Sequence, residues 1–335
     1  MFEVYGAGEN KGKSESTIDW DALQNYTVET ANLQQRETLV GYVAGIVDLG
    51  FQELGDAEAP FTGSEDEEAE IIAAHPDTYF KDGTDPVTKK PVRLKCWPQK
   101  PVQCVTLAID FPDIMLNKGQ FFGDENAEEK PLRLWLGGQF YLQDVGMVVG
   151  RPIPLKVSNI AQTGPTKPVW SLKPNHTLYK MAVGAKLVEA GKPFLPQDVD
   201  KLLGVSLQFE AQVFFKESKG KKYYTEYVAF KTGLGRGQVA SEPITSPFLI
   251  QMNKPNDKEA VSELRSHIIN TIKRANNYAG SVLEKELNEV RPPKQEVGTP
   301  EEKEDKPKAG IKKPSKKESA QLPPAGVDFD DDIPF

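Results

Sequence analysis

The sequence contains little cysteine and little histidine. Of its 335 residues, two are cysteine and three are histidine, and His75, His176 and His267 are scattered without metal-ligand spacing. A disulfide framework would need more cysteines, and a zinc site would need two ligands beyond Cys96 and Cys104. We therefore expect both cysteines to be reduced, and we expect neither a metal nor another cofactor.

Long apolar runs are also missing. No stretch approaches the ~20 apolar residues that a membrane-spanning helix needs, and residues 1–19 are polar and rich in Gly and Ser, unlike a signal peptide. We therefore expect no membrane segment and a cytoplasmic location.

Signatures of catalysis are absent as well. We find no nucleophile elbow, no spaced metal carboxylates and no kinase signature, and the segment GLGRG at 233–237 departs from both phosphate-binding glycine patterns. Asp110 and Asp113 flank Phe111-Pro112, which indicates a turn at the end of a strand rather than an acidic pair. We expect no enzyme activity.

The net charge of −8 is distributed unevenly. Segment 53–85 holds eleven Asp or Glu and one Lys, and segment 291–335 holds nine Lys or Arg and ten Asp or Glu. The rest of the chain then carries 31 Lys or Arg against 28 Asp or Glu, a net charge of +3. Acidity is thus concentrated in one insertion and at the end of the sequence, which permits a basic face on the body.

Short runs of β-branched and aromatic residues dominate the body, which we assign to residues 21–255 after a flexible arm at 1–20. The predicted strands lie at 39–51, 91–97, 101–111, 131–136, 138–142, 153–157 and 168–172, and 205–231 reads as a hairpin with a basic turn. Glycines 41, 45 and 50 within the first strand indicate a bulge or a strong bend. The pattern predicts a mainly β protein with a few helices (α+β).

Helical patterns are fewer. The acidic insertion 53–85 contains a short predicted helix, 192–204 reads as one helix, and 256–290 reads as one long helix with an apolar stripe. The stripe allows packing on the body or pairing with another chain, which leaves a homo-oligomer open. Residues 291–327 are rich in Pro, Lys and Glu, so we expect a disordered linker.

The last eight residues have a different character. Four carboxylates within five residues precede an apolar end, a combination suited to a pocket with a basic rim. The residues are Asp328, Phe329, Asp330, Asp331, Asp332, Ile333, Pro334 and Phe335. This segment resembles the C-terminal tip of bacterial single-stranded DNA-binding proteins. The body is longer than in that family and carries an acidic insertion, and the combination of this body with this tip resembles a bacteriophage single-stranded DNA-binding protein.

The resemblance implies the function. It implies a protein that coats single-stranded DNA in replication, recombination and repair, in the cytoplasm of a bacterial host cell near the nucleoid. The tip would dock helicases, nucleases, recombination mediators and polymerase-associated subunits. The usual scaffold for holding single strands is a five-stranded OB barrel, so we expect an OB-like core with insertions, a long C-terminal helix and a disordered acidic-tipped tail.

Single strands are held by aromatic rings and cations together. The candidates are therefore aromatic side chains with Lys or Arg beside them: Arg93, Lys95, Trp97, Arg133, Trp135, Trp170, Lys216, Lys219, Lys221, Lys222, Tyr223 and Tyr224. The basic hairpin is the favoured candidate among them. Two other functions stay open. One is an interaction protein that mimics the tip to capture host repair factors without binding DNA, and the other is a strand-annealing or recombination mediator.

Overall fold

The computed structural model describes residues 18–53, 55–85, 88–123, 127–138, 140–142, 147–149, 151–160, 169–218 and 220–291. The chain divides into two compact units. The first comprises Met1–Gln52 and Val102–Glu286, and the second comprises Glu53–Pro101 and Leu287–Phe335. The predicted arm up to residue 17, the predicted linker from residue 292 and the predicted tip lie outside the described residues.

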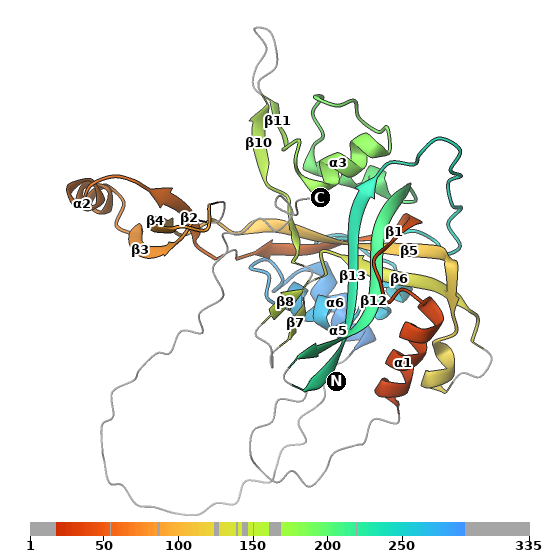
Figure 1. The fold of residues 1–335 in the computed structure, drawn as a ribbon. Coiled ribbons are helices and arrows are strands. Elements are labelled where there is room, and N and C mark those ends of the chain that lie inside the picture. Colours follow the sequence, from red (N-terminus) through yellow and green to blue (C-terminus); the bar gives the residue numbers. More distant parts are fainter. Residues whose placement is uncertain are drawn as a thin grey trace, which may run out of the picture. The chain divides into compact units, whose positions relative to one another are not determined.

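A large sheet forms the centre of the first unit (Figure 1). Five of its strands follow the order β13-β12-β1-β5-β6, with antiparallel neighbours. Their bounds are β1 Glu37–Gln52, β5 Val102–Leu116, β6 Lys130–Leu136, β12 Ser206–Ser218 and β13 Lys221–Thr232. Two shorter strands join the sheet, because β14 (Phe248–Ile250) pairs with β1 in parallel and β9 (Ile153–Pro154) pairs with β5. The prediction of a mainly β protein with a few helices is confirmed.

Strand β1 takes part in two antiparallel ladders besides its parallel pairing with β14. Its first part, Glu37–Tyr42, pairs with β12, and Tyr42–Gln52 pairs with β5. The register to β5 shifts between Val43 and Gly45 and again between Asp48 and Gly50, where Gly50 has φ +76°, a left-handed conformation that favours glycine. The glycine-rich first strand is therefore bulged, as the sequence predicts.

The two end strands of this sheet, β6 and β13, lie next to each other. No ladder joins them in the described chain. Instead, the guanidinium of Arg265 donates hydrogen bonds to the carboxylate of Glu226 on β13 and to the carbonyl oxygen of Arg133 on β6. The sheet is thus curled but not closed, because a side chain occupies the place of the missing ladder.

The interior of the curled sheet is apolar. Alternate residues of the strands point inward and are fully buried, among them Leu107, Ile109, Leu132, Leu134 and Phe209. Two helices complete this core: α1 (Trp20–Ala31), which Asp19 caps, and α3 (Thr177–Gly184). The predicted helix at 192–204 is a shorter 3-10 helix, η3 (Pro196–Leu202). Another 3-10 turn, η1, spans Gly119–Phe122.

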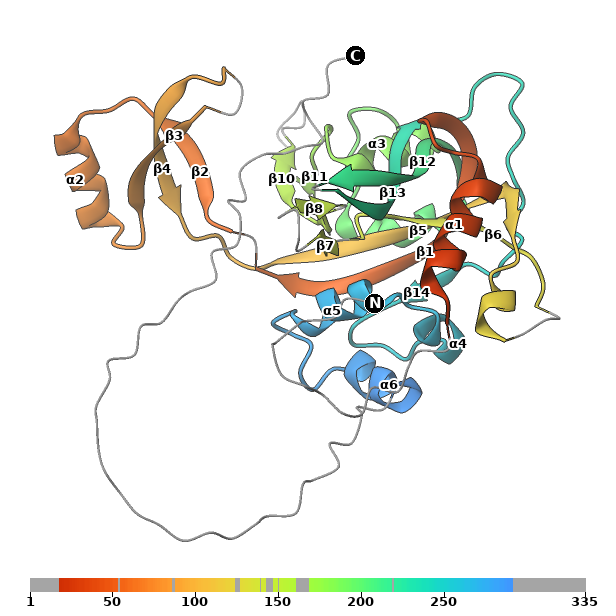
Figure 2. The same ribbon diagram turned by 60° about the horizontal axis from the view of Figure 1, so that its bottom comes forward.

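The prediction of one long helix at 256–290 was wrong. The segment forms three helices: α4 (Lys258–Ser262), α5 (Ser266–Lys273) and α6 (Val282–Val290). Extended backbone at Arg265 separates the first two, and Gly280, with φ +81°, lies between the last two. The breaks let the chain turn while its apolar stripe stays buried, and α5 lies along β1 (Figure 2).

Two small hairpins belong to the first unit. Strands β7 (Phe140–Leu142) and β8 (Met147–Val149) form one, and β10 (Val157–Ile160) and β11 (Val169–Leu172) form the other. We call the pair β10–β11 the ribbon.

The second unit contains a three-stranded sheet and an acidic helix. The sheet has the order β2-β4-β3, with β2 at Ala57–Phe61, β3 at Tyr79–Thr84 and β4 at Pro91–Trp97. Helix α2 (Glu65–Ala74) begins with a capping box between Ser64 and Glu67, so the predicted acidic helix is confirmed. Because β4 pairs with both β2 and β3, the insertion predicted at 53–85 continues to residue 101.

Candidate nucleic-acid interface

Arg133 is held by a buried carboxylate. Its Nε lies 2.7 Å from Oδ1 of Asp110 and its Nη2 lies 2.9 Å from Oδ2, across the β5–β6 ladder. The Asp110 side chain has no exposed surface. Burial is the largest single influence and acts to lower the pKa of Arg133, but the hydrogen bonds to Asp110 and the negative charges of Asp110 and Glu263 together outweigh it and raise that pKa. Asp110 lies inside β5, so the predicted strand-ending turn at this residue was wrong.

Three further groups complete the hydrogen bonding of this pair. The hydroxyl of Thr245 donates to Oδ2 of Asp110 at 2.9 Å, and the hydroxyl of Tyr42 donates to the same oxygen at 3.3 Å. A second carboxylate, that of Glu263, lies 3.4 Å from Nη1 of Arg133. The donors of Arg133 are thus directed at protein oxygens rather than at solvent.

Trp135 is covered as well. Only 9% of it is exposed, and its ring centroid lies 6.4 Å from that of Phe248. The Phe248 ring also lies 5.2 Å from the guanidinium carbon of Arg133. It packs directly on Gly45, where an added Cβ would come within 2.1 Å of the ring. The outer face of β1, β5 and β6 is therefore occupied by residues 241–286, which we call the C-terminal layer.

The C-terminal layer is too well buried to be displaced easily. Its fully buried apolar side chains are Ile250, Met252, Val261, Leu264, Ile268, Ile272 and Leu283. Exposing a side chain of this size costs roughly 1.5–3 kcal/mol, so exposing the set costs roughly 10 kcal/mol or more. A ligand with micromolar to nanomolar affinity supplies about 8–12 kcal/mol in total. Arg133 and Trp135 are thus structural parts of the fold.

A second ion pair, which is partly buried, lies at the seam between β6 and β13. The Tyr224 hydroxyl donates to Glu226 at 2.7 Å, and Glu226 accepts from Arg265. Burial raises the pKa of Tyr224 well above its usual value. Burial also lowers the pKa of Lys118, beside the two charges of this pair, to about 8. Tyr224, a predicted DNA contact, therefore packs inside the seam, and sequence reasoning missed Glu226 and Arg265 as its partners.

His267 next to this pair makes stability depend on pH. Burial, together with the charge of Arg265, lowers the pKa of His267 to about 4, whereas an unfolded histidine has a pKa of about 6.5. Between these values the unfolded chain binds more protons, so the free energy of unfolding should fall as the pH is lowered. We expect a loss of about 2 kcal/mol from this residue between pH 7 and pH 5.

Urea unfolding of wild type and His267→Asn at both pH values measures this effect. The variant should lose about 2 kcal/mol less than wild type over the same interval, because the carboxylates that titrate nearby are common to both proteins. Equal losses in the two proteins would show that His267 does not titrate in this way.

The basic hairpin at 205–231 carries its cations at the turn, residues 216–222. The register pairs Lys216 with Tyr223 on the outer face of β12 and β13, and Lys221 and Lys222 are exposed. Lys219 lies outside the described residues. Further along the same face, the guanidinium of Arg36 stacks on the ring of Tyr227 at 4.2 Å. The structure thus places part of the predicted hairpin set at the surface, together with a ring–cation pair that the sequence pattern did not indicate.

Arg93 in the second unit is bound by carboxylates. Arg93 makes two hydrogen bonds with Glu68, at 2.8 and 3.0 Å, and a third with Asp82 at 3.1 Å. The hydrogen bond from Arg93 lowers the pKa of Glu68. Lys95 lies 5.9 Å from the ring of Trp97, which is 37% exposed.

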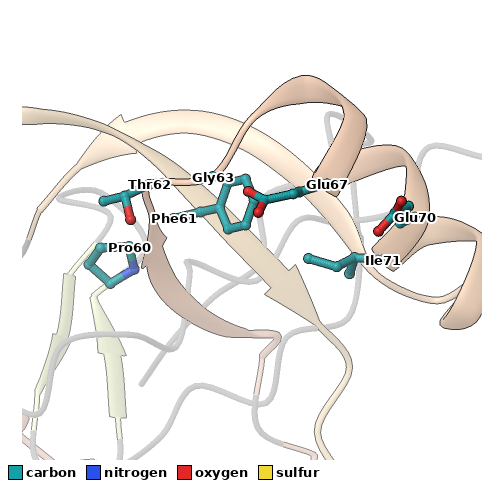
Figure 3. Close-up of a pocket in the computed structure, with 7 residues that line it drawn as sticks. All are labelled: Pro60, Phe61, Thr62, Gly63, Glu67, Glu70 and Ile71. Atoms are coloured by element: carbon teal, nitrogen blue, oxygen red, sulfur yellow. The ribbon is translucent and has the colours of Figure 1, made fainter.

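A hollow of about 560 Å³ lies beside α2 in the same unit (Figure 3). Its lining residues are Pro60, Phe61, Thr62, Gly63, Glu67, Glu70 and Ile71. Two carboxylates and no cation line this hollow, which makes it a poor site for a phosphate backbone.

Trp170 on the ribbon is exposed to solvent and has a lysine nearby in the sequence. It is 60% exposed, the highest value for a tryptophan in the described chain, and exposed Lys173 follows it. Of the predicted rings and cations, Trp170 and part of the basic hairpin reach the surface of the first unit.

Comparison with known proteins gives no relative. The chain matches no protein-family model, no curated protein and no solved structure. Within the described ranges, no helix is long and apolar enough to cross a membrane, and no group of three or more His, Cys, Asp or Glu is arranged to hold a metal ion.

Both cysteines are buried and unpaired, as predicted, and burial raises the pKa of the Cys104 thiol to about 12. A thiol with so high a pKa is a poor nucleophile.

Proposed function

We propose that this protein coats single-stranded DNA and recruits replication and repair proteins through residues 328–335. The observation that carries the proposal is the sequence DFDDDIPF, with its resemblance to the tip of bacterial single-stranded DNA-binding proteins. An acidic, aromatic-ended segment after a Pro- and Lys-rich stretch suits capture by a basic-rimmed pocket on a partner.

The strand order of the first unit supports this proposal. In an OB fold, five strands form a partly open Greek-key barrel. Here β1 bends and pairs with both β5 and β12, and the end strands β6 and β13 lie together. Helix α3 comes between the third and the fourth of these strands, as in that fold. We therefore propose an OB-like core, with the second unit inserted between its first two strands.

A gel-shift competition tests the DNA-binding part. Full-length protein should shift a labelled oligothymidine of about 30 nucleotides. Unlabelled oligothymidine should compete far better than the same mass of duplex DNA, because only unpaired bases offer free faces for stacking. Equal competition by duplex would contradict a preference for single strands.

A second candidate, the tip-mimicking protein without DNA binding, is favoured by one observation. In OB folds the face of the second and third strands contacts oligonucleotides, and here the C-terminal layer covers that face over Trp135 and Arg133. No shift of oligothymidine, combined with binding of a tip-docking partner, would support this candidate. A strand-annealing mediator would instead speed duplex formation between complementary strands.

A further inference from the structure

We propose that single-stranded DNA crosses the ribbon β10–β11, where a base stacks on Trp170 and the phosphates lie along Lys173, Lys180, Lys186 and Lys192. The inference rests on the proposed function and names the surface that performs it. It places the strand away from β5 and β6, whose outer face the C-terminal layer fills.

The Trp170 ring is exposed on a firmly anchored strand. At 60% exposure it packs into no core, whereas its neighbours Ser171 and Leu172 are fully buried. The Ser171 hydroxyl accepts a hydrogen bond from the backbone N–H of Phe194 at 2.9 Å and donates one to the carbonyl oxygen of Phe194 at 3.0 Å. That carbonyl oxygen also accepts a hydrogen bond from the N–H of Leu172 at 3.0 Å. An exposed ring on so fixed a strand is a ready stacking platform, because little side-chain freedom is lost on binding.

The surrounding segment carries the positive charge that a phosphate backbone requires. Residues 151–205 contain eight Lys or Arg and three Asp or Glu, a net charge of +5. In the described part of this segment, the exposed lysines near the ribbon and α3 include Lys173, Lys180, Lys186 and Lys192. In the described chain none of these four lysines forms a salt bridge with a carboxylate, whereas Lys201 pairs with Asp198.

One tyrosine ties two of these lysine-bearing stretches together. The Tyr179 hydroxyl on α3 accepts from the N–H of Gly191 at 2.8 Å and donates to the carbonyl oxygen of Lys192 at 3.0 Å. Hydrogen bonds therefore connect the helix that carries Lys180 to the segment that carries Lys192. Phe194, two residues further along that segment, is hydrogen-bonded to Ser171 on β11 of the ribbon. A single strand fits this combination of one ring and several cations, since stacking and phosphate contacts are its two main attractions.

The test compares two tryptophans that are both exposed. Trp170→Ala and Trp97→Ala are each titrated into fluorescein-labelled oligothymidine, and binding is measured by anisotropy. Trp97 is a matched control, since it is also exposed on a strand next to a lysine. We expect Trp170→Ala to bind about 5- to 150-fold more weakly than wild type and Trp97→Ala to bind within about twofold.

Two variants that each remove one positive charge add an independent measurement. Lys173→Gln should reduce the slope of log K against log salt by about 0.7, the change expected for one lost phosphate contact on a single strand. Lys201→Gln removes the same charge from the same segment at a residue paired with Asp198, and should leave the slope unchanged. Thermal melting of each variant confirms that it folds.

The outcomes separate the inference from the proposed function. If wild type binds and Trp170→Ala binds equally well, the ribbon is not the site, although the protein remains a single-strand binder. If Trp97→Ala is the variant that loses affinity, the strand binds the second unit instead. If wild type itself fails to bind, both the inference and the proposed function are wrong.

Discussion

Replacing Arg133 by leucine should lower the free energy of unfolding by about 3–5 kcal/mol. The substitution leaves the carboxylate of Asp110, which has no exposed surface, without its cation. The hydroxyls of Thr245 and Tyr42 would still donate to it, but hydroxyls do not neutralise a buried charge. Urea unfolding followed by circular dichroism measures the loss.

Lys130→Met is the matched control for this prediction. Lys130 lies on the same strand and pairs with Glu263 at 2.8 Å, but its side chain is 65% exposed, and exposed ion pairs contribute only about 0–1 kcal/mol. Arg133→Leu/Asp110→Leu should recover part of the stability lost by the single variant, because no charge is then buried alone. A loss below 1 kcal/mol for Arg133→Leu would show that this arginine is not structural.

The second large effect concerns the tip. Deleting residues 328–335 should abolish binding to a bacterial nuclease that docks on the tip of bacterial single-stranded DNA-binding proteins, because both the ring of Phe335 and the carboxylates are removed. Affinity for oligothymidine should be unchanged or slightly higher, since the acidic segment would no longer compete for basic surface. Pull-down of the purified nuclease and anisotropy with labelled DNA measure the two activities separately.

A single substitution sharpens this test. Phe335→Ala keeps every acidic side chain of the tip, so it should lose most nuclease binding if the ring fills an apolar hole on the partner. Val327→Ala removes a neighbouring apolar side chain just outside the tip and serves as the control. Undiminished pull-down by Phe335→Ala would mean that charge alone, and not the ring, is recognised.

Much of the strand content could be predicted from local pattern. The run PVRLKCW gives β4 with its bounds, and the hairpin at 205–231 gives β12 and β13, because alternation of polar and apolar residues has the period of a strand. The broken helix could not be predicted in the same way. Apolar residues spaced three and four apart continue across 256–290, and the stripe looks the same whether or not the backbone turns at Arg265.

The candidate site shows what local pattern leaves out. Trp135 and Trp170 both lie in strands next to basic residues, yet one is 9% exposed and the other is 60% exposed. The difference arises from Phe248, which packs on Trp135 from more than a hundred positions later in the chain. The pairing of Arg133 with Asp110 likewise depends on the β5–β6 register. Only tertiary structure decides which rings and cations reach solvent.

The most direct measurement is an anisotropy titration of labelled oligothymidine with the full-length chain at low and at moderate salt. A protein that grips the phosphates through several lysines should bind at 50 mM salt, and its affinity should fall steeply by 200 mM salt, with a slope of about −0.7 for each contacted phosphate. Some affinity should persist at the higher salt, because base stacking does not depend on counterion release. Absence of any binding at the lower salt would contradict a role in coating single-stranded DNA.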